Sequence, residues 1–199
     1  MKKIMSLALV LFLGGCIFYG KDLLCDRSKL EKELVRLHVV GASDSEHDQS
    51  VKLSVRDAVL QYMEPLLEGI TDPQQAKTYI ETHLPEIETA ANQALSQLGE
   101  AKQAVVSFMK EEFPVREYDS FSLPSGVYDS LRIVIGEGEG RNWWCVVFPK
   151  MCYNATKVKD VAAGAGFSED LTQAITGEYK IRFYFLDVLG KAQNFFHQG

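Results

Sequence analysis

The chain has 199 residues, of which 46% are hydrophobic and 24% are charged, and its net charge at pH 7 is -6. This composition is typical of a folded protein, and the length favours a single domain with its own core. A nucleic-acid partner is not expected, because binding to phosphates requires clustered Lys and Arg. The basic residues of this chain are instead spread along the sequence among acidic ones.

Residues 1–20 are predicted to be an export signal or a membrane anchor that lies outside the fold. Met1-Lys2-Lys3 is cationic, and residues 4–15 form a nearly unbroken apolar run. A run of ~12 residues suits a signal peptide and is short for a membrane-spanning helix, although residues 17–19 can extend it into an uncleaved anchor. With either type of segment, the rest of the chain is expected outside the cytoplasm.

The cysteines indicate lipidation or a disulfide rather than a metal site. Leu13-Gly14-Gly15-Cys16 resembles the lipobox of bacterial lipoproteins, in which Cys16 would be lipidated and hold the protein at the membrane. Cys145 and Cys152 are seven residues apart and can pair across a turn. Export would place this disulfide where it can persist. The sequence has no Cys-x-x-Cys and its four histidines are scattered, so neither a metal nor another cofactor is expected.

The sequence divides into a tether, one folded domain and a tail. Charge-rich residues 21–33 are predicted to form the tether or a frayed helix, and the tail from residue 190 to residue 199 is expected to be loose. The domain is predicted over residues 34–189. It begins with a β-branched stretch, residues 34–40, which is typical of a strand.

Two long amphipathic helices are predicted after this strand. Apolar residues recur at spacings of three and four over residues 51–66 and again over residues 76–98. Ser45 and Asp72 are expected to cap the two helices. Pro85 lacks a backbone donor and is therefore expected to kink the second helix.

After Gly99 the apolar pattern changes to the period of a strand. Strands are predicted at residues 105–109, 131–135, 144–148 and 179–185. The glycine-rich residues 136–140 are expected to form a hairpin loop. This order of elements predicts an α+β fold with a mostly antiparallel sheet and both long helices packed on one face.

The glycine-rich loop also invites comparison with a phosphate-binding loop. A dinucleotide-binding motif opens a helix, whereas this loop leads into a strand, and its two glutamates would repel phosphate. A hairpin tip or a recognition loop is the better interpretation.

Trp143 and Trp144 follow the glycine-rich loop and must point to opposite faces of their strand. Each ring can pack into the core or contact a partner.

A hydrolase is one hypothesis for His38 and the serine and aspartate residues that follow it. His38 precedes Ser43 and Asp44 by a few residues, and a serine nucleophile needs a base within hydrogen-bond reach. Helix capping and a solvated strand face explain the same residues with fewer assumptions.

Two runs of residues together resemble the stage II sporulation protein R family. The first is residues 36–45, continuing through Asp48, Gln49, Lys52 and residues 55–59. The second is residues 123–128 with residues 135–149, extended by Cys152, and residues 179–187 resemble the family's ending. The likeness spans residues 34–187, with Ala42 standing where the family pattern has Asn.

The resemblance implies a role in endospore formation. Members of this family are made in the forespore and exported into the space between the two septal membranes. There they trigger a membrane-embedded aspartic protease of the mother cell, stage II sporulation protein GA, which cleaves the sigma-E precursor. The resemblance thus implies a signalling protein that is not an enzyme, while an exported cell-wall hydrolase and a lipoprotein scaffold remain the alternatives.

The candidate partner-binding residues come from the two motifs, where exposed polar and aromatic chemistry is densest. The predicted contact residues are Arg36, Asp44, Asp48, Lys52, Arg56, Gly138, Gly140, Asn142, Trp143 and Trp144. The partners expected are the membrane protease and the membrane itself.

Overall fold

The computed structural model describes residues 25, 27–118, 121–152, 158–164, 167 and 169–176. The predicted export segment, Cys16, the predicted strand at residues 179–185 and the tail lie outside these residues. Within the described part, no helix is both long and apolar enough to cross a membrane.

Helices and strands are mixed along the chain, which confirms the predicted α+β class. A first helix covers residues 27–33. The elements that follow are β1 (Val35–Val40), α2 (Glu46–Leu66), α3 (Pro73–Thr82), α4 (Leu84–Gln97), β2 (Ala104–Phe113), β3 (Arg116–Glu117), β4 (Ser122–Leu123), β5 (Gly126–Ile135), β6 (Asn142–Phe148), α5 (Val158–Gly164) and α6 (Glu169–Thr176).

The main sheet is mixed, which corrects the prediction of a mostly antiparallel one. Its four strands lie in the order β2-β5-β1-β6. β1 pairs parallel with β5 and antiparallel with β6, and β2 pairs antiparallel with β5. β1 thus inserts between two strands that follow each other in the chain, so the predicted hairpin does not form. The chain instead runs along β5, passes over the end of β1 and returns along β6. We call the residues that pass over β1, residues 136–141, the crossover loop.

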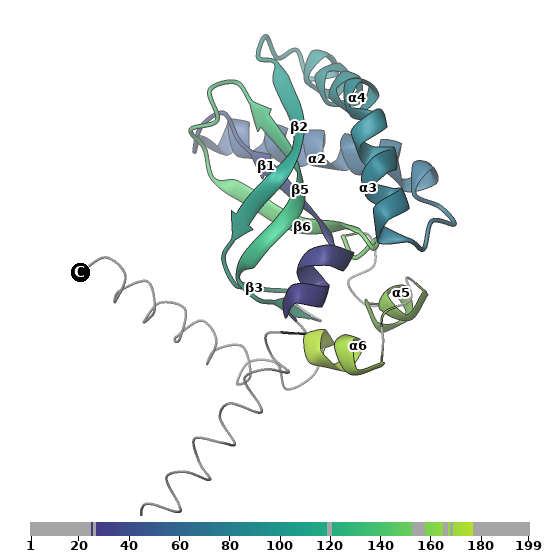
Figure 1. The fold of residues 1–199 in the computed structure, drawn as a ribbon. Helices are drawn as coiled ribbons and strands as arrows, with labels where there is room; N and C mark the ends of the chain where they lie inside the picture. Colours follow the sequence, from purple (N-terminus) through teal and green to yellow (C-terminus); the bar gives the residue numbers. More distant parts are fainter. Residues whose placement is uncertain are drawn as a thin grey trace, which may run out of the picture.

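The first face of the sheet carries the helices that the sequence predicts. Leu37 and Val39 of β1 pack with Val55 and Val59 of α2 and with Leu95 of α4 in one buried cluster. Figure 1 shows α2 passing behind the sheet, with α3 and α4 to one side of it.

The helix ends agree with the predicted signals. Ser45 accepts a hydrogen bond from the backbone of Asp48, and Asp72 accepts one from the backbone of Gln75, so both predicted caps are confirmed. α3 and α4 meet at His83, two residues before Pro85, where the break was expected. Local capping chemistry therefore sets these boundaries.

A second, smaller cluster covers the lower part of the other face. Leu30 of the first helix, Phe113 of β2, Tyr128 of β5 and Ile175 of α6 are all buried in it. Leu30 is 0% exposed, so residues 27–33 of the predicted tether pack on the domain as a helix. In Figure 1, α5 and α6 lie below the sheet at this end.

Candidate functional site

The two sequence motifs meet where the crossover loop passes over the chain that leaves β1. Gly140 N donates to Gly41 O at 2.8 Å, and Glu139 N donates to Ala42 O at 3.3 Å. A Cβ on Gly140 would lie 2.3 Å from Ser43 O, a distance that real structures do not show. Glycine is required at this position because two backbone segments touch there.

A buried lysine fastens this crossing to α2. Lys52 is 4% exposed, and its Nζ donates to Gln49 Oε1 at 2.6 Å and to Arg141 O at 2.8 Å. Gln49 Nε2 in turn donates to Ser43 O at 2.8 Å. Burial lowers the pKa of Lys52, and the charge of Arg141 lowers it further. The Lys52 side chain therefore links α2 to the crossover loop by hydrogen bonds.

Five of the six amides of the crossover loop are already used within the chain. Gly136 N donates to Gln103 O and Gly138 N to Ile135 O. Arg141 N donates to Asp44 Oδ1 at 2.7 Å, and the amides of residues 139 and 140 bond the chain after β1. A phosphate cradle needs amides that point at the ligand, so this loop does not have the geometry of one.

Asp48 anchors an ionic network at the start of α2. Its carboxylate accepts from Lys102 Nζ at 2.7 Å and from Ser43 Oγ at 2.5 Å, and the bond from Lys102 is the main cause of its lowered pKa. Lys102 also bonds Glu100, which contacts His47. Ligand atoms of His47, Asp48 and Glu100 lie within 4.8 Å of one another, but the ammonium group of Lys102 already supplies the positive charge between the carboxylates.

His38 belongs to a polar row that crosses the sheet on its second face. Its Nδ1 lies 2.8 Å from Glu111 Oε1, and its Nε2 lies 2.9 Å from Asn142 Oδ1. Ser130 Oγ donates to the other oxygen of Glu111 at 3.0 Å. The imidazole also stacks on Trp144, with ring centroids 3.9 Å apart. The row takes one residue from each of the four strands.

This arrangement does not support the hydrolase hypothesis. Both ring nitrogens of His38 are occupied by Glu111 and Asn142, whereas Ser43 bonds Asp48 and Ser45. A general base must reach the proton of its nucleophile, and no described hydrogen bond joins His38 to Ser43. The solvated strand face that the sequence suggested is also wrong, because His38 is 4% exposed.

The two tryptophans point to opposite faces of the sheet, as predicted. Trp143 packs against the first cluster, and the Arg56 guanidinium lies over its ring at 4.6 Å from the centroid. Trp144 packs against the second cluster and contacts Phe113 edge to face. Both rings are partly buried, so each contributes to packing.

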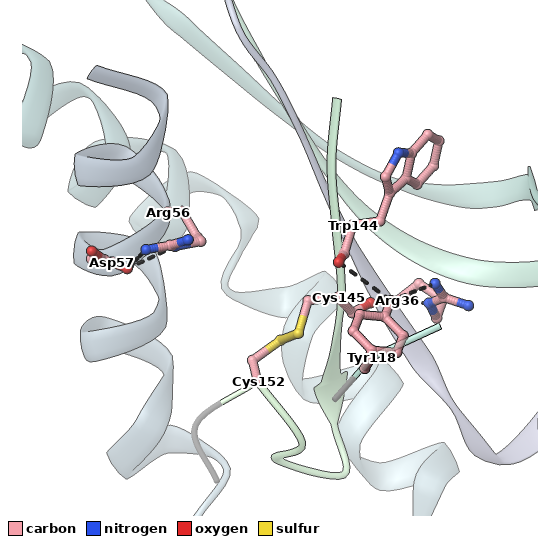
Figure 2. Close-up of a disulfide and its surroundings, with 7 residues drawn as sticks. All are labelled: Arg36, Arg56, Asp57, Tyr118, Trp144, Cys145 and Cys152. Atoms are coloured by element: carbon pink, nitrogen blue, oxygen red, sulfur yellow. Dashed lines mark hydrogen bonds and ion pairs between the residues drawn. A yellow bond between two sulfur atoms is a disulfide. The ribbon is translucent and has the colours of Figure 1, made fainter. Parts of the chain in front are cut away.

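A disulfide joins Cys145 of β6 to Cys152, with the two Cα atoms 5.9 Å apart. Cys152 N also donates to Val146 O at 3.2 Å, so the chain after β6 folds back along that strand. Figure 2 shows the disulfide on the side of β6 that faces α2, while Arg36, Tyr118 and Trp144 lie on the other side.

The predicted contact residues do not form one continuous face. Arg36, Asp48 and Lys52 are buried, and Arg36 lies on the opposite face of the sheet from α2. Asp44 and Asn142 are exposed, and the remaining predicted residues are partly buried: Arg56, Gly138, Gly140, Trp143 and Trp144. The structure therefore places Asp44 beside Arg141, the neighbour of Asn142 in the chain, and uses several of the others as internal supports.

Sequence reasoning missed three residues that organise this region. Arg141 lies inside the second motif and has a 69% exposed side chain beside Asp44, so its place in the motif was an available signal. Lys102 lies just before β2, and Glu111 lies within it. Only the pairing of distant strands brings these two residues to the site.

Fold and site together define an α+β domain in which two motif loops interlock over the end of a central strand. Residues 31–158 match the model of the Stage II sporulation protein R family, and the chain belongs to this family. It is therefore a sporulation protein.

A relative supports the same assignment. The chain is 32% identical over 161 residues to Stage II sporulation protein R of Bacillus subtilis (strain 168), covering 77% of this chain and 72% of the relative. No solved structure gives a significant match.

Proposed function

We propose that this protein is an exported signal that binds and activates the membrane-embedded aspartic protease of the mother cell, stage II sporulation protein GA. The protease then cleaves the sigma-E precursor. The observation that carries the proposal is membership of the stage II sporulation protein R family, supported by the way the motif residues are used. Their side chains form structural networks around an exposed crossover and are not gathered around a nucleophile.

Activation by binding sets an energetic requirement. The protein must bind the active form of the protease more tightly than the inactive form, by ~5.5 kcal/mol if it moves the balance from 1:99 to 99:1. A rigid contact surface helps to meet it, because little conformational entropy is lost on association.

The crossover surface, defined as Asp44, Arg141 and Asn142, is the contact site we propose. Asp44 and Arg141 are 64% and 69% exposed at their side chains, and the backbones beneath them are held by the hydrogen bonds of the crossing. Lys52, packed under the loop, fixes it to α2. The surface thus presents exposed polar groups on a well-supported backbone, as a recognition site requires.

Co-expression in a non-sporulating bacterium tests the activity. The full chain, the membrane protease and a tagged sigma-E precursor are produced together, and precursor cleavage is followed by immunoblot. Cleavage is expected only when all three proteins are present. Equal cleavage without the chain, or no cleavage with a protease known to be competent, would count against the proposal.

Arg141→Ala tests the contact site in the same cells. Two hydrogen bonds of Arg141 come from its backbone and survive this substitution, which removes the exposed side chain and its ion pair with Asp44. Cleavage is expected to fall at least ~10-fold, which corresponds to ~1.4 kcal/mol. Lys110→Ala on β2 is the matched control, because its side chain is 67% exposed and also lies beside an aspartate. Equal cleavage by both variants at equal protein level would exclude Arg141 from the contact.

A further inference from the structure

Asn142 is the exposed end of the polar row that crosses the sheet. It is the first residue of β6, and its Oδ1 lies 2.9 Å from Nε2 of the buried His38. Its amide nitrogen Nδ2 has no hydrogen-bond partner within the described part of the chain. The hydrogen bond to His38 therefore decides which end of the Asn142 amide is left for a partner.

The ring of His38 is held in one orientation by two neighbours. It stacks on Trp144, with ring centroids 3.9 Å apart and planes that differ by 9°. Its Nδ1 lies 2.8 Å from Glu111 Oε1. The stack fixes the plane of the ring, and the contact with Glu111 fixes which edge faces β2. Nε2 therefore points toward Asn142.

The surroundings of Glu111 indicate that His38 donates from Nδ1. Glu111 Oε2 accepts a hydrogen bond from Ser130 Oγ at 3.0 Å, and Arg132 Nη1 lies 3.6 Å from Oε1. Both neighbours suit an ionised carboxylate, which only accepts hydrogen bonds. Asn142 Oδ1 is also an acceptor, so Nε2 donates as well. An imidazole that donates from both nitrogens is an imidazolium, and Glu111 is its counterion.

We propose that His38 fixes Asn142 as a hydrogen-bond donor of the crossover surface, and that Asn142 Nδ2 binds an acceptor oxygen of the protease, either a carboxylate or a main-chain carbonyl. This inference rests on the proposed function, because it names the chemistry that the same site recognises. In the opposite arrangement, a neutral ring would accept from Asn142 Nδ2 and leave Oδ1 for the partner. His38 is thus a positioning residue that sets the specificity of the surface.

Nitrogen NMR of the purified full chain in micelles at neutral pH tests the ring without the protease. With nitrogen-15 histidine, correlations between ring nitrogens and protons show which nitrogens are protonated, and His38→Gln assigns the signals. Both nitrogens of His38 are expected to carry protons in the wild type. Glu111→Gln removes the counterion and is expected to remove the proton from Nε2. A wild-type Nε2 without a proton, or one that keeps its proton in Glu111→Gln, overturns the proposal.

Asn142→Asp tests the outward donor in the co-expression assay. Aspartate keeps an oxygen for His38 and replaces the free amide nitrogen by a second acceptor. Precursor cleavage is expected to fall at least ~10-fold, the usual effect of leaving a bound polar group unpaired, while urea unfolding stays unchanged. Gln93→Glu is the matched control, because it makes the same change at an exposed position of α4. Full cleavage by Asn142→Asp at equal protein level overturns the proposal.

Glu111→Gln tests whether the ring acts through Asn142. The variant is expected to lose as much cleavage as Asn142→Asp, and full cleavage by a variant whose Nε2 has lost its proton overturns the proposal. With purified proteins in vesicles, high salt should partly restore Asn142→Asp if the protease presents a carboxylate, because salt screens the repulsion, and should not restore it if the acceptor is a carbonyl. A wild type that does not activate the protease would instead reject the proposed function, and the NMR measurement would still decide the state of His38.

Discussion

At the scale of single residues, the crossover depends on one glycine and one aspartate. Gly140 allows two backbones to touch, and Asp48 ties the start of α2 to the segment before β2.

Gly140→Ala is expected to destabilise the protein by roughly 1–3 kcal/mol, because the new Cβ would meet the carbonyl of Ser43 and force the two backbones apart. Gly164→Ala is the matched control, since nothing lies within 4 Å of its Cβ position. Urea unfolding of the full chain in micelles measures both variants. Equal stability of the two would mean that the crossing is looser than described.

Asp48→Asn is expected to change how stability depends on pH. The bonds from Lys102 and Ser43 lower the pKa of Asp48 in the folded state, so its contribution is fully present above the unfolded value of about 4 and is lost as pH falls through the lower folded value. Unfolding free energy plotted against pH should thus have a shallower acid slope in the variant, by a fraction of one proton. Asp57→Asn controls for losing one carboxylate from the same helix. Identical slopes in wild type and Asp48→Asn would contradict the network.

The chemistry of the motif residues was only partly predictable from the sequence. The cap at Ser45 follows from a local pattern and is where it was predicted. The burial of Arg36 and His38 was not, because an alternating strand shows which residues share a face but not what covers that face. Here β2 and α6 supply the cover, and both are far from β1 in the chain.

At the scale of elements, the insertion of β1 between β5 and β6 explains the glycine-rich loop. A two-strand hairpin needs only a short turn, whereas this loop must pass over a third strand and the chain that leaves it. The sequence placed both long helices, the break at His83 and most strands, since these have local signals. It could not show the strand order, because parallel pairing joins distant segments.

The disulfide holds the end of β6 against its own following chain. Replacing both Cys145 and Cys152 by Ser is expected to cost roughly 2–3 kcal/mol, because the cross-link closes a loop with a sequence separation of 7. Urea unfolding with and without reductant measures the effect, and the double variant should be insensitive to reductant. Cys25→Ser, which removes the free exposed thiol, should leave stability unchanged. A wild type equally stable in reductant would show that the cross-link contributes nothing.

At the scale of the whole molecule, the sheet separates two regions with different roles. One face and its helices form the main core and support the crossover surface. The other face buries Arg36, whose Nη1 has no hydrogen-bond partner among the described residues, and carries the polar row of His38. Asn142 belongs to both the crossover surface and this row, because its Oδ1 bonds His38 Nε2.

The most direct measurement of the proposed function is a titration of the full chain, added outside, into vesicles that contain the protease in their membrane and the sigma-E precursor inside. An activator that acts by binding should raise the cleavage rate until it equals the protease in molar amount, and the rate should fall again when the chain is removed. Full activation by a small fraction of an equivalent, persisting after removal, would contradict the account and indicate an enzyme.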